Sequence, residues 1–170
     1  MKQKPLATSH KPLGVLLLLC VFAGCESTPP VKTYPTITIH GRTWIAEVAM
    51  TTEQRYQGLS GRMTLSDRSG MLFIYPEPRV LDFCMRKCPN PIDIAFLDAS
   101  RKVVKIYTMQ PELDLGDGPG YSSEVPAQFA FETAGGALSA AGVQVGDIVT
   151  FSADMPDAAK AQSDPEPEGR

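Results

Sequence analysis

The chain has 170 residues, of which 43% are hydrophobic, so it is long and apolar enough for one folded domain of ordinary size. All 19 acidic residues follow residue 24, whereas three of the 16 basic residues precede it, so residues 25–170 carry a net charge of −6. That negative balance argues against nucleic acid as a partner.

The N-terminus has the layout of a signal peptide. Lys2, Lys4 and Lys11 precede an apolar run from Leu13 to Phe22. This run has the length of a signal h-region and falls well short of the roughly 20 apolar residues of a membrane-spanning helix. We therefore expect residues 1–24 to be a signal peptide that is removed.

The end of this segment, Phe22-Ala23-Gly24-Cys25, resembles a lipobox, in which small residues admit the signal peptidase and the cysteine thiol takes a diacylglycerol. We expect a palmitate-bearing lipoprotein anchored through Cys25 in the inner or the outer membrane of the cell envelope. The domain would then lie in the periplasm, an oxidising compartment that permits disulfides. The alternative is a secreted protein without a lipid, cleaved near the same place.

Composition divides the rest of the chain into three parts. Residues 25–35 are rich in proline and small polar residues, which is typical of a flexible tether. Residues 36–153 form a single globular domain. Residues 154–170 are rich in Ala, Pro, Asp and Glu and lack aromatic residues, so we expect a disordered acidic tail whose removal leaves stability unchanged.

Short runs with period-two alternation, typical of half-buried strands, dominate the domain. They predict a hairpin of residues 36–39 and 44–48, followed by strands at residues 71–75, 92–97, 103–107, 129–133 and 147–151. One short helix begins at a capping box of Thr51 and Gln54 and ends at Gly58, and a second covers residues 136–141. The predicted fold class is mainly β (α+β): a compact, mostly antiparallel sheet or barrel of about seven short strands with two short helices.

Five motifs of the domain resemble domain-of-unknown-function family 192, in the family's order and spacing. They are Arg55-x-x-Gly58-Leu59-x-x-Arg62, Gly70-Met71-Leu72-Phe73, Phe83-x-Met85 with Pro91-Ile92-Asp93-Ile94-x-Phe96, Tyr121-x-Ser123, and Gly142-x-x-x-Gly146-Asp147. The resemblance runs from about Ile45 to Phe151 and implies a small exported β-rich domain. It implies no function, since the family has none established.

One segment departs from the family's pattern. Where the family usually reads Phe-Trp-Met-Lys-Asn-Thr, this chain reads Phe83-Cys84-Met85-Arg86-Lys87-Cys88, so Trp, Asn and Thr are replaced by Cys, Lys and Cys, while the basic position survives as Arg86. A large aromatic surface and two neutral hydrogen-bonding groups are lost. If this segment lines the family's site, the ligand of this chain differs.

No complete catalytic or metal-binding set is recognisable. His40, the one histidine after the signal peptide, lies at the predicted hairpin turn, where a histidine is usually solvated. Cys84, Cys88 and His40 do not have the spacing of a metal site, and residues 116–120 lack the helix that follows a phosphate loop. We therefore predict no cofactor and no metal.

Two carboxylates stand inside apolar strands, Asp93 in residues 92–97 and Glu132 in residues 129–133. A carboxylate facing inward needs a donor or a cation, such as Arg62 or Arg86, to offset its desolvation. The alternative, which we favour for Asp93, is that it points to solvent or accepts a backbone N–H. Arg55 is interpreted as a solvated or salt-bridged structural residue.

The two cysteines of the domain, Cys84 and Cys88, are expected to form a disulfide, because both would be exposed to the oxidising periplasm. Four residues of extended strand span roughly 13 Å, whereas a disulfide needs Cα atoms about 4.4–6.8 Å apart. The bond therefore requires a turn in this segment. The alternative is two unpaired cysteines packed as small apolar groups.

Two classes of function stay open. In the favoured one, Arg86, Asp93, Tyr121 and Ser123 converge near a long loop, residues 111–126, and bind a small polar ligand or a protein partner. In the other, the domain is an enzyme, hydrolytic through a carboxylate or redox through Cys84 and Cys88. Binding is favoured because the general acid–base equipment is sparse. An enzyme should show Asp93 or Glu132 in a concave pocket with a second titratable group in hydrogen-bond reach.

Overall fold

The computed structural model describes residues 34–111 and 120–164. The predicted signal peptide, Cys25, nearly all of the tether, the centre of the long loop and the last six residues lie outside these ranges. In chain order the elements are β1 (Thr36–Ile39), β2 (Arg42–Ala49), α1 (Thr52–Gln57), β3 (Ser69–Arg79), β4 (Asp82–Phe83), β5 (Ile92–Leu97), β6 (Val103–Met109), β7 (Tyr121–Ser122), β8 (Ala127–Ala134), α2 (Ala137–Ala140), β9 (Thr150–Phe151) and the 3₁₀ helix η1 (Ala158–Lys160).

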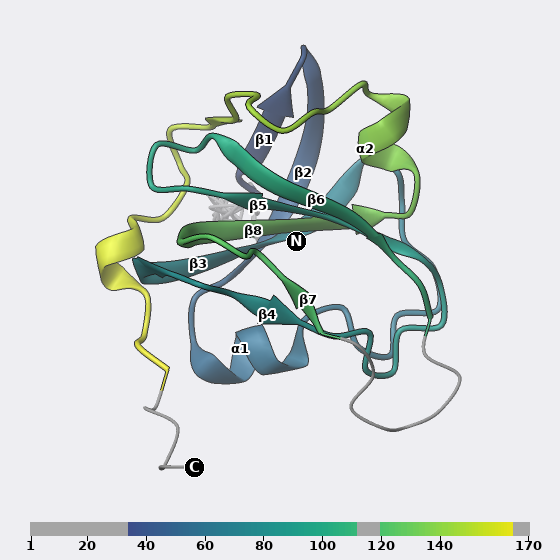
Figure 1. The fold of residues 1–170 in the computed structure, drawn as a ribbon, viewed down its shortest axis with the longest axis horizontal. Coiled ribbons are helices and arrows are strands. Elements are labelled where there is room, and N and C mark those ends of the chain that lie inside the picture. The colour runs from purple at the N-terminus through teal and green to yellow at the C-terminus, as the bar shows by residue number, and fades with distance from the viewer. Residues whose placement is uncertain (1–33, 112–119, 165–170) are drawn as a thin grey trace, which may run out of the picture. The chain divides into compact units, whose positions relative to one another are not determined.

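Seven of the strands form one curled sheet in the order β6-β5-β8-β3-β2-β1-β9, as Figure 1 shows, and β4 and β7 form a separate pair. Every neighbouring pair in the large sheet is antiparallel except β2 and β3, which are parallel and are connected through α1. The predicted fold class, a mostly antiparallel β fold with two short helices, is confirmed.

The strand predicted at residues 147–151 is shorter than expected, because its first residues pair elsewhere. Asp147 accepts a backbone hydrogen bond from Val103, and Ile148 forms an isolated bridge with Lys102 at the start of β6. Only the last two residues, β9, pair with β1. This segment therefore joins both edges of the curled sheet.

The sheet carries an apolar core on each face, because its central strands β5 and β8 are buried on both sides. One core contains Trp44, whose ring meets that of Phe131 edge to face with 5.9 Å between centroids. The other contains Phe73, Ile94 and Phe96. Successive residues of a strand face opposite cores, so Phe131 and Glu132 point to different sides of the sheet.

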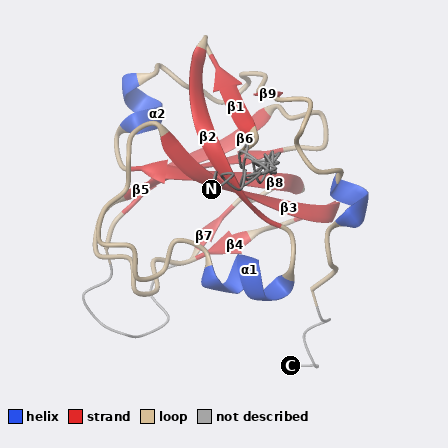
Figure 2. Ribbon diagram, turned by 180° about the vertical axis from the view of Figure 1, so that it is seen from behind, coloured by secondary structure: helices blue, strands red, loops and turns tan. Residues whose placement is uncertain are grey.

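Helix α1 begins and ends as the sequence predicts. The Thr51 hydroxyl accepts from the Gln54 backbone N–H, and the Gln54 side chain accepts from the Thr51 N–H, which completes the capping box. Gly58 ends the helix with a φ of 47°, which favours glycine. Figure 2 shows α1 beside β4, with α2 at the opposite end of the sheet.

The predicted disordered tail is not what the structure shows for residues 154–164. Helix η1 packs on β3, Ala161 is buried, and the Gln162 N–H donates to the Met50 carbonyl. The polar composition of this segment predicts disorder, but two of its apolar side chains, Met155 and Ala158, pack against the core. Within the described ranges, no helix is long and apolar enough to span a membrane.

Candidate functional site

A cavity of about 400 Å³ lies between α1, β3, β4 and the segment after β4. Leu59, Phe73 and Phe83 provide its apolar walls, and the rings of Phe73 and Phe83 meet edge to face with 4.8 Å between centroids. Gly58 brings α1 close to this wall, since a Cβ there would stand 3.4 Å from the Phe73 ring. The walls can therefore accept a small apolar or aromatic group.

Glu132 of β8 is a buried polar group of the cavity. It faces the same side of the sheet as Phe73 and is 4% exposed. No described residue donates a hydrogen bond to its carboxyl group, and burial raises its pKa to about 8. At neutral pH this group is therefore mostly a neutral carboxylic acid, whose O–H can donate to a ligand.

Tyr75 stands beside Glu132 and is also held neutral. Burial is the main cause that raises the pKa of its phenol to about 12, and the negative charge of Asp164 adds to it. The Tyr75 ring also carries the Arg55 guanidinium 4.7 Å from its centroid. The inner part of the cavity thus presents two uncharged hydroxyl-bearing groups next to apolar walls.

Arg86 provides positive charge at the rim of the cavity. Its guanidinium lies 3.7 Å from the centre of the Tyr56 ring and donates to the Tyr56 carbonyl. Tyr56 is exposed on α1, so the pair projects from the helix toward solvent. Of the four residues predicted to bind a ligand, Arg86 is the one that lines the cavity.

The other three predicted site residues are not brought into the cavity. Asp93 is buried and accepts from the Thr108 hydroxyl at 2.7 Å and from the Leu138 N–H of α2 at 2.9 Å. Ser123 is buried, accepting from the Leu81 N–H and donating to the Val125 carbonyl. These contacts give Asp93 and Ser123 structural roles, in agreement with the backbone-capping alternative for Asp93.

Tyr121 lies behind the cavity wall, because its strand β7 pairs with β4 and places it opposite Phe83. Its hydroxyl accepts from the Gln110 N–H at 3.2 Å, and its ring contacts that of Tyr107. Tyr121 therefore lies next to Phe83 in the strand pair, outside the cavity. Of the four residues predicted to converge on one ligand, only Arg86 lines this cavity.

Cys84 and Cys88 both line the cavity, but the structure contains no disulfide between them. Cys84 is exposed, whereas Cys88 is buried with its thiol 3.6 Å from the Arg86 carbonyl. The predicted bond is therefore absent from the structure, in which the two cysteines differ in exposure. The turn that it requires is present, since the Cys88 N–H donates to the Met85 carbonyl and Lys87 has a φ of 55°.

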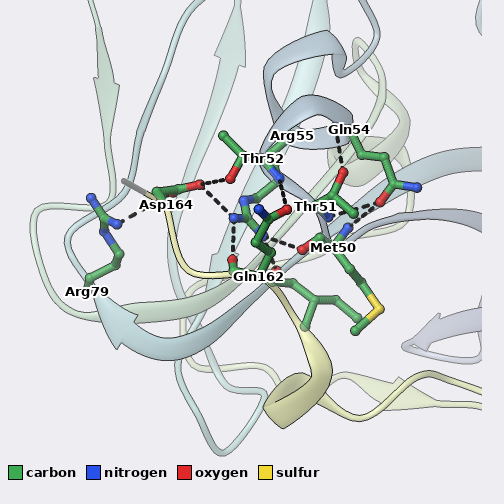
Figure 3. Close-up of polar contacts among 9 residues, drawn as sticks. Met50, Thr51, Thr52, Gln54, Arg55, Arg79, Gln162 and Asp164 are labelled. Atoms are coloured by element: carbon green, nitrogen blue, oxygen red, sulfur yellow. Dashed lines mark hydrogen bonds and ion pairs between the residues drawn. The ribbon is translucent and has the colours of Figure 1, made fainter. Parts of the chain in front are cut away.

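Arg55 of α1 is a cavity residue whose importance sequence reasoning missed. Its side chain is 4% exposed and pairs with Asp164 at 2.6 Å, as Figure 3 shows. Its spacing of three from Gly58 in the first family motif was the available signal. Asp164 gave no signal, because it lies in a segment predicted to be disordered.

The arrangement is better equipped for binding than for acid–base chemistry. Glu132 lacks a second titratable side chain hydrogen-bonded to it among the described residues. His40 lies at the β1–β2 turn, paired with Asp147 at 3.0 Å and outside the cavity. No group of three or more His, Cys, Asp or Glu side chains in residues 34–111 and 120–164 is placed to hold a metal ion.

Comparisons with known proteins found one family model and solved structures of similar fold. The family model of domain-of-unknown-function family 192 (DUF192), described as "Uncharacterized ACR", matches residues 35–151. The chain is similar to the crystal structure of a "putative transcription regulator" from Sinorhizobium meliloti 1021, with a TM-score of 0.62, 25% identity, and coverage of 72% of this chain and 98% of that one. It is also similar to a protein of unknown function from Novosphingobium aromaticivorans DSM 12444, with a TM-score of 0.62, 28% identity, and coverage of 75% and 94%. No curated protein matches the chain.

Proposed function

Because this chain belongs to domain-of-unknown-function family 192, its role has to come from its own cavity, and we propose that it is a lipid-anchored periplasmic binding domain for a small, partly apolar ligand. The observation that carries the proposal is the buried, neutral Glu132 beside the aromatic walls of the cavity. Pockets that combine apolar walls with a few placed polar groups are typical of small-molecule sites.

The chemistry of the walls defines the ligand class. A flat or aromatic group fits between Phe73 and Phe83, and a carbonyl or ether oxygen on it would accept from the Glu132 O–H. Arg86 at the rim favours electron-rich groups at the outer end of such a ligand. The departure of residues 84–88 from the family's pattern lies on this cavity, so the proposed ligand is specific to this chain.

The enzyme alternatives are less well supported. Hydrolysis through Glu132 needs a partner that the described side chains do not place within hydrogen-bond distance. A redox reaction through Cys84 and Cys88 needs the two sulfurs to approach each other, and both are free cysteines in the structure. The transcription-regulator description of the S. meliloti structure is not carried over, because a chain with net charge −6 after the signal peptide is poorly suited to nucleic acid.

The cavity is tested with benzamide, whose carbonyl can accept from Glu132 and whose ring fits the aromatic walls. Binding to the purified full chain is followed by NMR chemical shifts. Glu132→Leu should weaken binding by about tenfold, the equivalent of one hydrogen bond, whereas Glu132→Gln keeps a donor and should retain most of the affinity.

The control variant is Glu77→Gln, an exposed glutamate on β3 outside the cavity, which should leave the affinity unchanged. Affinity should also fall as the pH rises through about 8, because ionised Glu132 loses its donor. Equal affinity in the wild type and Glu132→Leu, or no binding to either, would contradict the proposal.

A further inference from the structure

The C-terminal segment supplies a charged residue to a cavity that otherwise consists of family residues. The family match ends at residue 151, yet the described chain continues across β3 to residue 164. Asp164, the last described residue, lines the cavity together with Arg55 and Glu132. The cavity of this chain thus contains an acidic group from outside the matched domain.

Asp164 is held like a bound carboxylate. One oxygen accepts from Arg55 Nη2 at 2.6 Å and from the Thr52 hydroxyl at 3.3 Å, and the other lies 3.5 Å from Arg79 Nη1. Figure 3 shows the carboxylate between these groups, which come from α1 and β3. Two guanidinium groups and a hydroxyl around one carboxylate are the donor set of an anion site.

The guanidinium of Arg55 is positioned independently of the C-terminal segment. Its Nη1 donates to the Met50 carbonyl at 2.7 Å and to the Ile74 carbonyl at 3.1 Å, and the Tyr75 ring lies beneath it. These partners all belong to the matched domain. Nη2, in contrast, bonds only to Gln162 and Asp164 among the described residues.

Buried Nε of Arg55 has no hydrogen-bond partner among the described residues. The side chain is more than nine-tenths buried, so a cation oriented in this way requires an anion at Nη2. In this chain Asp164 provides that anion.

We propose that Arg55, Arg79 and Thr52 form a carboxylate-binding subsite of the cavity, and that Asp164 occupies this subsite as an internal ligand. A ligand that carries a carboxylate has to displace the C-terminal segment before it can pair with Arg55, so the segment is a built-in competitor. The inference rests on the proposed function only in placing such a ligand in the same cavity. The subsite itself is testable with a simple anion.

The first test uses acetate, which is the side chain of Asp164 as a free ion. In the full chain with Asp164→Ala, acetate should bind and raise the melting temperature more than chloride at equal ionic strength, whereas the wild type should respond equally to both salts. Asp154→Ala is the matched control, because it removes the same charge from the same segment at an exposed side chain that does not touch Arg55. Adding Arg79→Gln to Asp164→Ala should weaken the acetate response, since Arg79 is half exposed and its loss leaves the core intact.

The second test compares benzoate with benzamide, two probes of the same shape that differ in charge. Asp164→Ala should increase the affinity for benzoate by about tenfold relative to the wild type, because the benzoate carboxylate can then form charge-assisted hydrogen bonds with Arg55. The affinity for benzamide, which has no carboxylate, should be unchanged. Asp164→Asn, which preserves the size of the side chain, should give a smaller gain in the same direction and covers the case in which the alanine variant fails to fold.

Equal responses to acetate and benzoate in the wild type and in both Asp164 variants would overturn the subsite. The two proposals fail separately. Acetate binding without benzamide binding would leave the subsite standing and reject the apolar cavity function, whereas benzamide binding without any acetate effect would do the reverse.

Discussion

Glu132 and Asp93 are two buried carboxyl groups on neighbouring strands with opposite surroundings. Asp93 is satisfied by Thr108 and by the first turn of α2, whose N-cap Gly136 has no side chain to do this. Glu132 instead faces the cavity, and burial alone accounts for its raised pKa. The first carboxyl group therefore stabilises the fold, while the second decreases its stability whenever it ionises.

The stability of the domain should fall as the pH rises from about 4.5 to about 8, because the folded state holds the Glu132 proton more tightly than the unfolded chain. Glu132→Gln removes this ionisation, so the variant should be more stable than the wild type at pH 7 by roughly 3 kcal/mol. The two proteins should be equally stable near pH 4. Denaturant unfolding at several pH values measures the difference in the free energy of unfolding, with Glu77→Gln as the control. If this free energy depends on pH in the same way in the wild type and in Glu132→Gln, the raised pKa of Glu132 is wrong.

Asp93→Ala should lower the free energy of unfolding by about 2 to 3 kcal/mol, since it leaves the Leu138 N–H and the Thr108 hydroxyl without their acceptor. Binding of benzamide to the folded variant should be unchanged. Thr108→Val removes one of the two contacts and should cost about half as much. A variant that is fully stable but fails to bind would instead restore the ligand-binding role predicted for Asp93.

Sequence reasoning identified both carboxylates as unusual but could not say which one faces a cavity. Their roles depend on strand pairing that is distant in sequence: Glu132 lies opposite Ile94, and Asp93 lies opposite Thr133. Alternation along a strand predicts that neighbours face opposite sides, yet it does not reveal what covers each side. Arg86 was predictable because it keeps the basic position of a family segment. Arg55 was interpreted as a solvated or salt-bridged residue, but its partner could not be predicted because Asp164 lies 109 positions away.

At the scale of elements, the long alternating strands and the capped helix α1 were predictable because their signals are local. The pair β4 and β7 was not, since two-residue strands have no periodicity to detect. The parallel pairing of β2 and β3 also has no local signal. The close approach of β3 to β8 at Gly70 is another property that only the paired strands reveal.

Gly70→Ala should lower the free energy of unfolding by about 3 kcal/mol, the upper end of the usual cost of overpacking. A Cβ at this position would lie 2.2 Å from the Glu132 carbonyl oxygen and 2.5 Å from the Phe131 ring, so β3 and β8 would have to separate. Gly120→Ala is the matched control, because a Cβ there has no atom of the described residues within 4 Å. Equal melting temperatures for the two variants would be inconsistent with the register of β3 on β8.

A chain that ends at Ala153 should melt about 10 °C lower than the full chain, in contrast to the unchanged stability expected from composition. It loses the packing of Met155, Ala158 and Ala161 and leaves Arg55 without Asp164, which together are worth about 3 kcal/mol. A chain that ends at Asp164 keeps all of these contacts and should melt with the full chain. If both truncations melt alike, the docking of residues 154–164 is wrong.

At the scale of the whole molecule, the family match and the sheet end together at residue 151. The mostly β architecture was predictable from the sequence because alternation marks its strands. The pairing of residues 147–151 with both β6 and β1 was not, because it joins strands that are distant in sequence. In the proposed function, Cys25, which precedes the sheet in the sequence, places the domain in the cell envelope.

Cys25→Ala should release the protein from the membrane or leave it unprocessed, because a single thiol would carry the lipid. Growth with labelled palmitate followed by fractionation of the cell envelope measures both effects. Cys20→Ala is the control, since Leu19 before it is too bulky for the lipoprotein signal peptidase, and it should be labelled normally. Label in the Cys25→Ala protein would reject the anchor.

The pairing of β1 with the segment around β9 also affects how this chain can fold. The Thr36 N–H donates to the Ser152 hydroxyl, and the Ser152 N–H donates to the Thr36 carbonyl, so the first strand synthesised is completed by the last. Until β9 has been added, the outer edge of β1 has no partner strand, and such an edge can pair with another chain. A chain cut before Thr150 would therefore be prone to strand exchange with other copies, whereas a chain that continues to Ser152 can pair this edge itself.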